Sequence, residues 1–382
     1  MRNHQARRLR TYLFDGLLPL TRDCFVDRKF GGFHERLDSS GKPIRLGYKR
    51  LLVQCRQIYL LSHAALTGDA ESLQDARQGV EFLQRYWDQQ RGGWFLQCTL
   101  RGQPLDRTKD AYGHAFVLLA MAYFHRASQD PQALELAART LGVLEEHFAE
   151  PVHGGFIEAA DENWSGLPRT RRQNPHMHLL EGFLAIYQES HDQRYLAQAQ
   201  RMVELFESHF FDADNRTLGE YFSDDWTRHP ECGEIVEPGH HFEWYWLLYG
   251  YAQATGNDAV LPAAEAMRTW ALKHGLDGEY GGVFDAVNRD GTVSLATKRI
   301  WPLLECIKAS AIRYEHSRNL QDLELLGKCI DDLFQRHLCK DGRWKEHLDA
   351  EGAILNPDLP GTTGYHLFLG LSEALRVLET LE

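Results

Sequence analysis

Gly92-Gly93-Trp94-Phe95 is the clearest copy of a short motif that recurs along the whole chain. Close copies are Gly31-Gly32-Phe33 and Gly154-Gly155-Phe156, and weaker ones stand at Gly219-Glu220-Tyr221-Phe222, Gly281-Gly282-Val283-Phe284 and Gly342-Arg343-Trp344. The last glycine of each copy is at position 32, 93, 155, 219, 282 or 342, so the intervals run from 60 to 64 residues. Spacing this even identifies a sixfold internal repeat.

The segments between the motifs are helical in pattern and of two kinds. Helices with one charged face and one apolar face are predicted at 4–25, 69–87, 131–148, 193–210, 258–274 and 320–337. Helices that are apolar nearly all round are predicted at 49–67, 112–128, 174–190, 240–255, 298–317 and 365–381. An all-round apolar helix needs covered flanks, which places the second set inside the first.

Outer and inner helices alternating six times predict an all-α fold, the (α/α)6 toroid. Six outer and six inner helices would form the ring, and the Gly-aromatic segments would be short β-hairpins or loops at one end. Glycine pairs supply the positive φ angles that such turns need. No Pro/Ser-rich linker interrupts the pattern, so we expect residues 1–382 to form a single domain.

Composition excludes several classes of protein. The net charge of -12 and the lack of a basic stripe argue against a nucleic-acid partner. Seven cysteines without a Cys-x-x-Cys pair fit a reducing cytoplasm. No apolar run is long enough for a membrane span, and the N-terminal run around Asp15 lacks the features of a signal peptide. A homodimer stays open, because the oligomeric state cannot be deduced from the sequence.

The toroid predicts where a functional site should lie. If all inner helices start at one rim, side chains in their first turns surround one cavity. The residues 19 to 24 positions after each motif glycine are Arg56, His114, His178, His240, Trp301 with Glu305, and His366. Ring-bearing or charged groups at every equivalent position predict one polar pocket, since buried helices normally exclude them.

The stretch from Glu237 to Trp246 is the richest part of this rim. His240 and Glu243 are three residues apart and share a helix face, with Trp244 beside them. A titratable imidazole, a carboxylate and aromatic rings suit a polar, ring-shaped ligand such as a sugar.

Each rim residue also has a structural interpretation. Arg56 could be a core arginine paired to a carboxylate, and His114 could bind a backbone carbonyl. Asn174 could be a helix N-cap. Glu181 and Glu305 could orient other groups, and tryptophans such as Trp244 are more often core residues than sugar platforms. The pairs His178/Glu181 and His240/Glu243 could bind a metal, but without further converging carboxylates we expect no metal and no cofactor.

Four segments resemble the N-acylglucosamine 2-epimerase superfamily. They are Arg171-Arg-Gln-Asn-Pro-His-Met-His178-Leu-Leu-Glu181, Glu237-Pro-Gly-His240-His-Phe-Glu243-Trp244, Lys298-Arg-Ile-Trp301-Pro-Leu-Leu-Glu305 and Tyr365-His366. The resemblance covers nearly the full chain and implies the same (α/α)6 barrel. It also implies functional roles for Arg56, Tyr112, Asn174, His178, His240, Glu243, Trp301 and His366. The surroundings of His178 are closer to the mannose-type isomerases than to the acylamino-sugar epimerases.

The chemistry of this superfamily demands a base that works near neutral pH, which histidine supplies. We therefore predict an aldose-ketose isomerase for a mannose-like monosaccharide. His240 and His366 would transfer protons, with Glu243 orienting His240. Arg56 and His178 would stabilise the enediolate.

Asn174, Tyr112 and Trp301 would hold the sugar, with His114, Trp244 and Glu305 as further lining residues. A sugar 2-epimerase is the alternative within the superfamily. A glycoside hydrolase, which needs two carboxylates flanking the bond, is less favoured because Glu243 and Glu305 are the only obvious pair. Whether a sulfonate or phosphate is recognised stays open.

Overall fold

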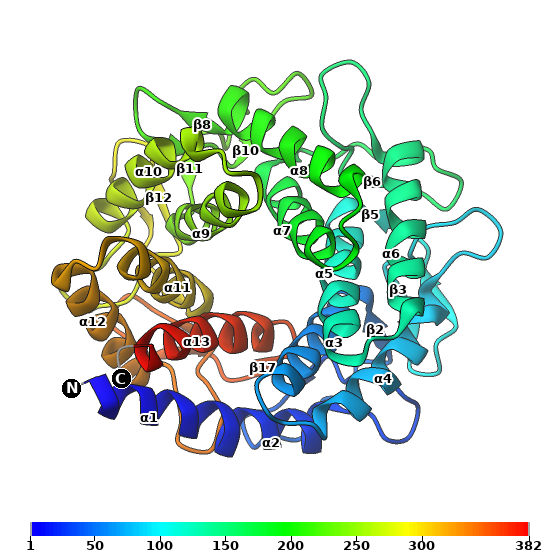
Figure 1. The fold of residues 1–382 in the computed structure, drawn as a ribbon, viewed down its shortest axis with the longest axis horizontal. Coiled ribbons are helices and arrows are strands. Elements are labelled where there is room, and N and C mark those ends of the chain that lie inside the picture. Colours follow the sequence, from blue (N-terminus) through cyan, green and yellow to red (C-terminus); the bar gives the residue numbers. More distant parts are fainter. Residues whose placement is uncertain (1, 381–382) are drawn as a thin grey trace.

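The computed structural model describes residues 2–380, which form a ring of helices in two concentric layers (Figure 1). Within this range six long helices line the inside of the ring. They are α3 (Leu51–Leu66), α5 (Ala111–Ser128), α7 (Gln173–Ser190), α9 (Pro238–Thr255), α11 (Ile300–Ser317) and α13 (Thr363–Glu379). Most side chains of these helices are buried, as their all-round apolar sequences require.

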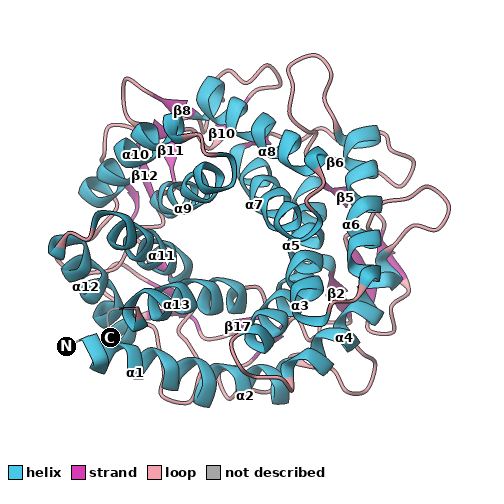
Figure 2. Cartoon of the chain, in the orientation of Figure 1, coloured by secondary structure: helices cyan, strands magenta, loops and turns pink. Residues whose placement is uncertain are grey.

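The outer layer alternates with the inner one along the chain (Figure 2). Its members are the segment α1 (Arg2–Arg10), η1 (Thr11–Leu17), α2 (Leu18–Leu20) and η2 (Thr21–Phe25), followed by α4 (Ser72–Leu83), α6 (Pro131–Val143), α8 (Gln193–Leu205), α10 (Leu261–His274) and α12 (Leu320–Arg336). Short 3-10 or π-helical turns extend four of them: η3 (Gln84–Tyr86), η4 (Leu144–Phe148), η5 (Phe206–Phe210) and η6 (Asp258–Val260).

These two layers confirm the predicted (α/α)6 toroid. The predicted inner helices begin within two residues of the observed ones, because a turn motif and an apolar run mark the start of each helix in the sequence. The predicted end of the last helix, Leu381, lies outside the described residues. One hydrophobic cluster fills the space between the layers and includes residues from Ala6 to Leu378.

Short antiparallel strand pairs join each repeat to the next, at the end of the ring where the inner helices begin. The six pairs are β2 (Tyr48–Arg50) with β3 (Gln97–Thr99), β5 (Lys109–Asp110) with β6 (Ala159–Ala160), β7 (Arg171–Arg172) with β10 (Tyr221–Phe222), β11 (Ile235–Val236) with β12 (Ala286–Asn288), β14 (Lys298–Arg299) with β15 (His347–Leu348), and β17 (Leu359–Pro360) with β1 (Arg36–Leu37). The last pair returns to the first repeat, so the pairing closes a circle.

Five more strands complete four local hairpins, so the predicted hairpins are present as well as the pairs between repeats. These strands are β4 (Pro104–Asp106), β8 (Phe211–Asp212) paired with β9 (Thr217–Leu218), β13 (Val293–Leu295) and β16 (Ile354–Asn356).

Buried cations fasten the glycine turns to the starts of the inner helices. The ammonium of Lys49 lies 2.7 Å from the carboxylate of Asp27, and that of Lys109 lies 2.9 Å from Asp88. Lys298 and Asp277 repeat the pair at 2.8 Å. All three lysines are at most 1% exposed, so each ion pair is shielded from water and from salt.

A second recurring contact joins the inner helices to the turns. The backbone N–H of Trp94 donates to Nε2 of His114, and that of Phe156 donates to Nε2 of His176. In the fourth repeat the N–H of Leu218 donates to His241. The fourth copy of the motif therefore centres on Leu218, and the prediction that Gly219 supplies its turn is wrong. Gly219 does not adopt a positive φ angle, whereas Gly93 and Gly155 do.

The N-terminal helix closes the ring against the C-terminal one (Figure 1). Helix α1 packs on α13 and α12, and Gln5 donates to the carbonyl of Gly327. Arg8 pairs with Asp331, and Tyr12 donates to the carbonyl of Gly342. The sixth outer helix is thus supplied by the start of the chain. Among the described residues, no helix combines the length and the apolar character required to cross a bilayer.

Two adjacent glycines allow a matched test of the turn geometry. Gly154 and Gly155 have φ angles of +77° and +76°, but only Gly155 is crowded: an added Cβ would lie 2.8 Å from the His176 ring and 2.9 Å from Trp226. Gly154→Ala should cost about 1–2 kcal/mol through its left-handed backbone alone. Gly155→Ala should cost roughly 1–3 kcal/mol more through overpacking. Thermal unfolding followed by circular dichroism measures both, and equal losses would contradict the described packing.

Candidate active site

The rim residues of five inner helices converge where these helices begin. His240 is in the first turn of α9, and His366 is in the first turn of α13. The indole of Trp301, from the start of α11, lies between them, with ring centroids 5.0 Å from His240 and 5.7 Å from His366. Both imidazoles are largely buried, and both lie beside the same indole.

Glu220 holds the imidazole of His240. Its Oε2 lies 2.9 Å from Nδ1 of His240. Burial opposes a charge on His240, but the carboxylates of Glu220 and Glu237 outweigh it and raise the pKa of His240 to about 9. The expectation that Glu243 orients His240 is therefore corrected: that position belongs to Glu220, and His240 is an imidazolium at neutral pH.

The side-chain amide of Asn174 meets the other nitrogen of His240, at 3.1 Å from Nε2. Asn174 is the second residue of α7 and does not cap the helix. A cationic His240 donates from both nitrogens, so the amide oxygen should face it. That oxygen is otherwise buried without a partner within residues 2–380. If the oxygen and nitrogen of the Asn174 amide are exchanged, the amide oxygen accepts a hydrogen bond from Nε2–H of His240.

His366 has the opposite charge state. Its Nδ1 lies 2.8 Å from Oε1 of Glu305, which is fully buried. Burial, aided by the nearby charges of Arg56 and Lys308, lowers the pKa of His366 to about 4 despite this carboxylate. Lys308 and His366 hold the pKa of Glu305 at about 2 against the effect of burial. His366 is therefore neutral at pH 7, with Nδ1–H donated to Glu305 and Nε2 left as a base.

His178 belongs to a third cluster, on α7. Its Nδ1 lies 3.0 Å from Oε2 of Glu181, and the hydroxyl of Tyr365 donates to the other oxygen of Glu181 at 2.5 Å. Burial lowers the pKa of His178 to about 4. Its Nε2 lies 3.9 Å from Oε1 of Glu243. Burial and the charge of Glu305 raise the pKa of Glu243 well above its ordinary range, which favours its protonated form.

Arg56 reaches the same region from α3. Its guanidinium donates to the hydroxyl of Tyr112 at 2.9 Å and to the carbonyl of Thr362 at 3.2 Å. It also stacks near the rings of Phe116 and Tyr365, at 4.3 and 4.9 Å. These contacts fix a cation at the wall of the site, where developing negative charge on a ligand would be stabilised.

Two predicted lining residues lie elsewhere. Nδ1 of His114 binds the carbonyl of Asp110 at 2.7 Å, and its Nε2 accepts from Trp94 at 3.1 Å, so both ring nitrogens serve the backbone. Trp244 is fully buried, donates to Gln173 at 2.7 Å and stacks on Phe206 towards the outer layer. Neither is available to a ligand, which corrects the prediction for both.

Comparison with known proteins identifies the family of this site. The model of N-acylglucosamine 2-epimerase (GlcNAc 2-epimerase) matches residues 31–370. The chain belongs to the N-acylglucosamine 2-epimerase family. It is thus a sugar-converting enzyme, because the matched relatives are isomerases and 2-epimerases.

Individual relatives cover nearly the whole chain. Mannose-6-phosphate isomerase of Rhizobium meliloti (strain 1021) is 32% identical over 97% of this chain and 96% of its own. D-mannose isomerase of Thermobifida fusca is 31% identical over 73% of this chain and 74% of its own. The solved structure of cellobiose 2-epimerase from Spirochaeta thermophila DSM 6192 has a TM-score of 0.88 at 26% identity, covering 100% of this chain and 98% of that one.

The sequence argument missed two residues of this family member's site. Glu220 follows Leu218 by two positions, and acidic residues also follow the turn residue by two at Glu35, Glu158, Asp285 and Glu346. Aligning Leu218 with the other turn residues would have found it. Lys308, which lies 2.5 Å from Glu305, gave no comparable signal, because one lysine in an apolar helix resembles a surface residue.

Three sets of side chains have ligand atoms within 4.8 Å of one another: His178, Glu181 and Glu243; Glu220, Glu237 and His240; and Glu243, Glu305 and His366. Carboxylates do converge here, contrary to the expectation from sequence. Protonation of Glu243 and the ammonium of Lys308 already balance the charge of two of these sets. The prediction that no metal is needed stays a prediction.

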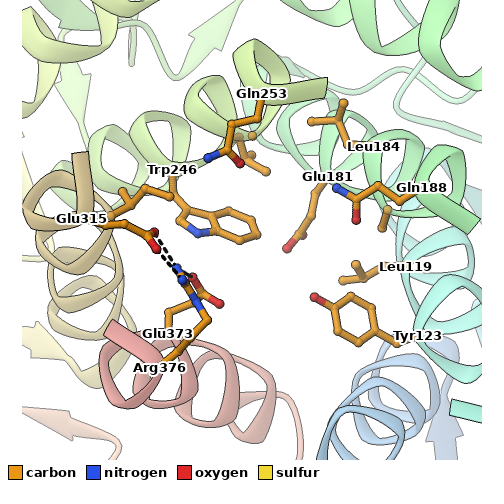
Figure 3. Close-up of a pocket in the computed structure, with 14 residues that line it drawn as sticks. Leu119, Tyr123, Glu181, Leu184, Gln188, Trp246, Gln253, Glu315, Glu373 and Arg376 are labelled. Carbon is orange, nitrogen blue, oxygen red and sulfur yellow. Dashed lines mark hydrogen bonds and ion pairs between the residues drawn. The ribbon is translucent and has the colours of Figure 1, made fainter. Parts of the chain in front are cut away.

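A separate cavity of about 330 Å³ opens from the opposite end of the ring. Its lining residues come from the middle and the second halves of the inner helices, and Figure 3 shows Trp246, Glu181 and Tyr123 turned into it. The ion pair between Arg376 and Glu315 lies at its wall (Figure 3). Glu181 thus lines this cavity while it also binds His178.

The contact between Glu220 and His240 generates a prediction. Glu220→Gln keeps a side chain of the same size but removes the charge that stabilises the imidazolium. The pKa of His240 should fall by about 1–3 units, and the basic limb of the pH-rate profile should move to lower pH by the same amount. The matched variant Glu243→Gln should move that limb less, because Glu220 contacts Nδ1 of His240 directly and Glu243 contributes least to raising the pKa of His240. If Glu243→Gln caused the larger shift, the assignment of Glu220 would be wrong.

Proposed function

We propose that this enzyme is an aldose-ketose isomerase of a mannose-like monosaccharide, with His366 as the base and His240 as the acid. The observation that carries the proposal is the pair of imidazoles beside Trp301, one held by Glu220 and the other by Glu305. The carboxylates around His240 raise its pKa against burial, whereas burial lowers the pKa of His366. A neutral imidazole can accept a proton from carbon, and an imidazolium can donate one to oxygen. The resemblance to proteins named for mannose conversion supports the substrate class.

The reaction needs two proton movements once the sugar ring is open. Nε2 of His366 removes the C2 proton, the C–H electrons form the C1–C2 double bond, and the C1 carbonyl oxygen takes a proton from His240. The resulting enediol then loses the proton of its C2 hydroxyl to His240. C1 takes back the proton held by His366, which leaves a carbonyl at C2 and both histidines in their starting states.

Neighbouring groups suit the remaining demands of this chemistry. Glu305 keeps the Nδ1–H tautomer of His366, so that Nε2 is the basic atom. The guanidinium of Arg56 and the hydroxyl of Tyr112 can stabilise charge on the enediolate oxygens. The face of Trp301 can support the apolar side of the sugar, while Asn174 is within reach of its hydroxyls.

A sugar 2-epimerase is the second candidate, favoured by the placement of the two histidines. Epimerisation returns the proton to C2 from the opposite face, which requires groups on both sides of the intermediate. His240 and His366 both lie beside Trp301 and come from different helices, so two proton-transfer groups are available for that step. A glycoside hydrolase is not supported, since Glu243 and Glu305 are each at most 1% exposed and cannot flank a bond.

The direct test is incubation with mannose, fructose, glucose and a β-linked disaccharide in D2O, followed by NMR. We expect mannose and fructose to interconvert, with deuterium partly incorporated at the transferred carbon, and no effect of EDTA. A C2 epimer formed without ketose would replace the proposal with the 2-epimerase. Cleavage of the disaccharide would exclude both, and loss of activity on EDTA treatment would contradict the metal-free mechanism.

The pKa values predict the pH dependence. His366 must be neutral to act, so kcat/KM should fall as the pH drops through about 4. His240 must be protonated to act as the acid, so kcat/KM should also fall as the pH rises through about 9. His366→Ala and His240→Ala should each reduce kcat at least about 100-fold, the lower end of what a proton-transfer group contributes. Full turnover in either variant would remove that residue from the mechanism.

A further inference from the structure

Lys308 is a buried lysine beneath the site. It lies on α11, one turn after Glu305, and both side chains are fully buried. Its Nζ is 2.5 Å from Oε2 of Glu305. Lysine is almost never fully buried unless it is paired, so the position calls for a physical reason. The proton transfers proposed for His240 and His366 do not use it.

Three glutamates surround this ammonium, and we call them with Lys308 the charge layer: Glu181 from α7, Glu243 from α9 and Glu305 from α11. Burial opposes the charge of Lys308, but the attraction of Glu305, its nearest carboxylate, outweighs burial and raises the pKa of Lys308 above the ordinary value. Lys308 is therefore a cation. Without it, up to three carboxylates would share a volume closed to water, which burial makes unfavourable.

Each ionised carboxylate of the charge layer also holds a group of the active site. Glu305 accepts from His366, and Glu181 accepts from His178 and Tyr365. Glu243 lies between the two, with an oxygen within 4.8 Å of ligand atoms of both sets. A change of charge at Lys308 therefore acts on the imidazoles through the carboxylates that bind them.

Trp246 separates Lys308 from the second cavity. The ring centroid of Trp246 lies 4.3 Å from Nζ of Lys308, within the range of a cation–π contact. The same indole lines the cavity at the opposite mouth (Figure 3). The ammonium is thus closed off from both ends of the ring, and its field acts on the carboxylates with little screening by water.

We propose that Lys308 is a positioning residue of the active site. Its ammonium keeps Glu305 ionised, so that His366 stays neutral, donates Nδ1–H to Glu305 and presents Nε2 to the substrate. The consequence for catalysis rests on the proposed role of His366 as the base. The effect on the charge of His366 does not depend on that role and can be measured separately.

The groups facing His366 show why Lys308 is decisive. On α11 they are Glu305 and Lys308, on α3 the guanidinium of Arg56, on α9 the carboxyl of Glu243, and on α13 itself the hydroxyl of Tyr365. Arg56 and Lys308 are the two cations that disfavour a charge on His366. Only Lys308 also contacts Glu305, so its removal destabilises both the neutral imidazole and the ionised carboxylate.

The test is the titration of His366 in Lys308→Met, followed by NMR of protein labelled at histidine, with His366→Ala to assign the signal. We expect the titration midpoint of His366 to rise by a pH unit or more, because the positive charge of Lys308 no longer opposes protonation of the His366–Glu305 pair. The acidic limb of kcat/KM should rise equally, which for a shift of one unit is a loss of about fivefold, relative to the unchanged enzyme, at the original midpoint. Lys308→Arg, which keeps the charge, should restore most of the original midpoint.

The control is Lys328→Met, the same substitution at an exposed position of the outer helix α12. It should change neither midpoint. A residue with a merely structural role would lower activity in Lys308→Met without moving the titration of His366. An unmoved midpoint therefore overturns the proposal, whether or not the enzyme proves to be an isomerase. A shifted midpoint without isomerase activity would uphold Lys308 and reject the proposed function instead.

If Lys308→Met does not fold, Lys308→Met combined with Glu181→Gln serves for the same measurement. This double variant removes one cation and one carboxylate together, so the net charge of the charge layer is kept. It leaves the contact between Glu305 and His366 intact. A raised midpoint of His366 is expected there too, because Lys308 touches Glu305 directly, and an unchanged midpoint overturns the proposal.

Discussion

The circle of strand pairs at the mouth of the ring is the constraint on which the site depends. Six inner helices can bring their first turns to one point only if their starts are held at one level. Each start is held by a strand that pairs with the neighbouring repeat, and the pair of β17 with β1 leaves no free end in the circle. Buried pairs such as Lys49 with Asp27 then fasten the turns to the same level. Backbone bonding of this kind is independent of side-chain identity, so the side chains of the first turns are free to vary in chemistry.

In the site, buried carboxylates and cations balance one another's charges out of contact with water. The pKa values of the two histidines are shifted in opposite directions, because their carboxylate partners differ in their surroundings. Glu220 and Glu237 both face His240, and their sum makes it a cation. Glu305 contacts both His366 and Lys308. The ammonium of Lys308 offsets most of the attraction of Glu305 for a proton on His366, so His366 stays neutral. One fold can therefore hold an acid and a base of the same residue type a single indole apart.

Much of this could be predicted from the sequence, and the reasons are specific. The repeat gave the toroid and the rim, because helix period and turn glycines are local signals. His240, His366, Trp301 and Arg56 were singled out because their position in the repeat places them near the starts of inner helices, and Asn174 because of the family resemblance. Which histidine faces the axis and which faces the backbone is not local: His114 and His178 look alike in sequence, yet the former binds Trp94 and the latter Glu181.

The partner of His240 was misassigned for a related reason. Glu243 shares a helix face with it, but Glu220 approaches from the strand segment of the same repeat. Spacing along one helix cannot reveal a neighbour that arrives from a turn. Lys308 was missed because two of its three carboxylate neighbours, Glu181 and Glu243, come from other helices that are far from it in the chain. Such residues can be identified only from the three-dimensional structure, in which the helices of the ring are in contact.

The closure of the ring by α1 has a consequence for how the chain is made. Gln5 finds its partner Gly327 only after 322 further residues have been added. At roughly 5–20 residues per second, a ribosome needs on the order of tens of seconds for that stretch. Throughout this time the apolar face of the first helix has no permanent neighbour. Synthesis thus leaves a temporary gap in the outer wall, because α1 acquires these contacts only after the other repeats have been made.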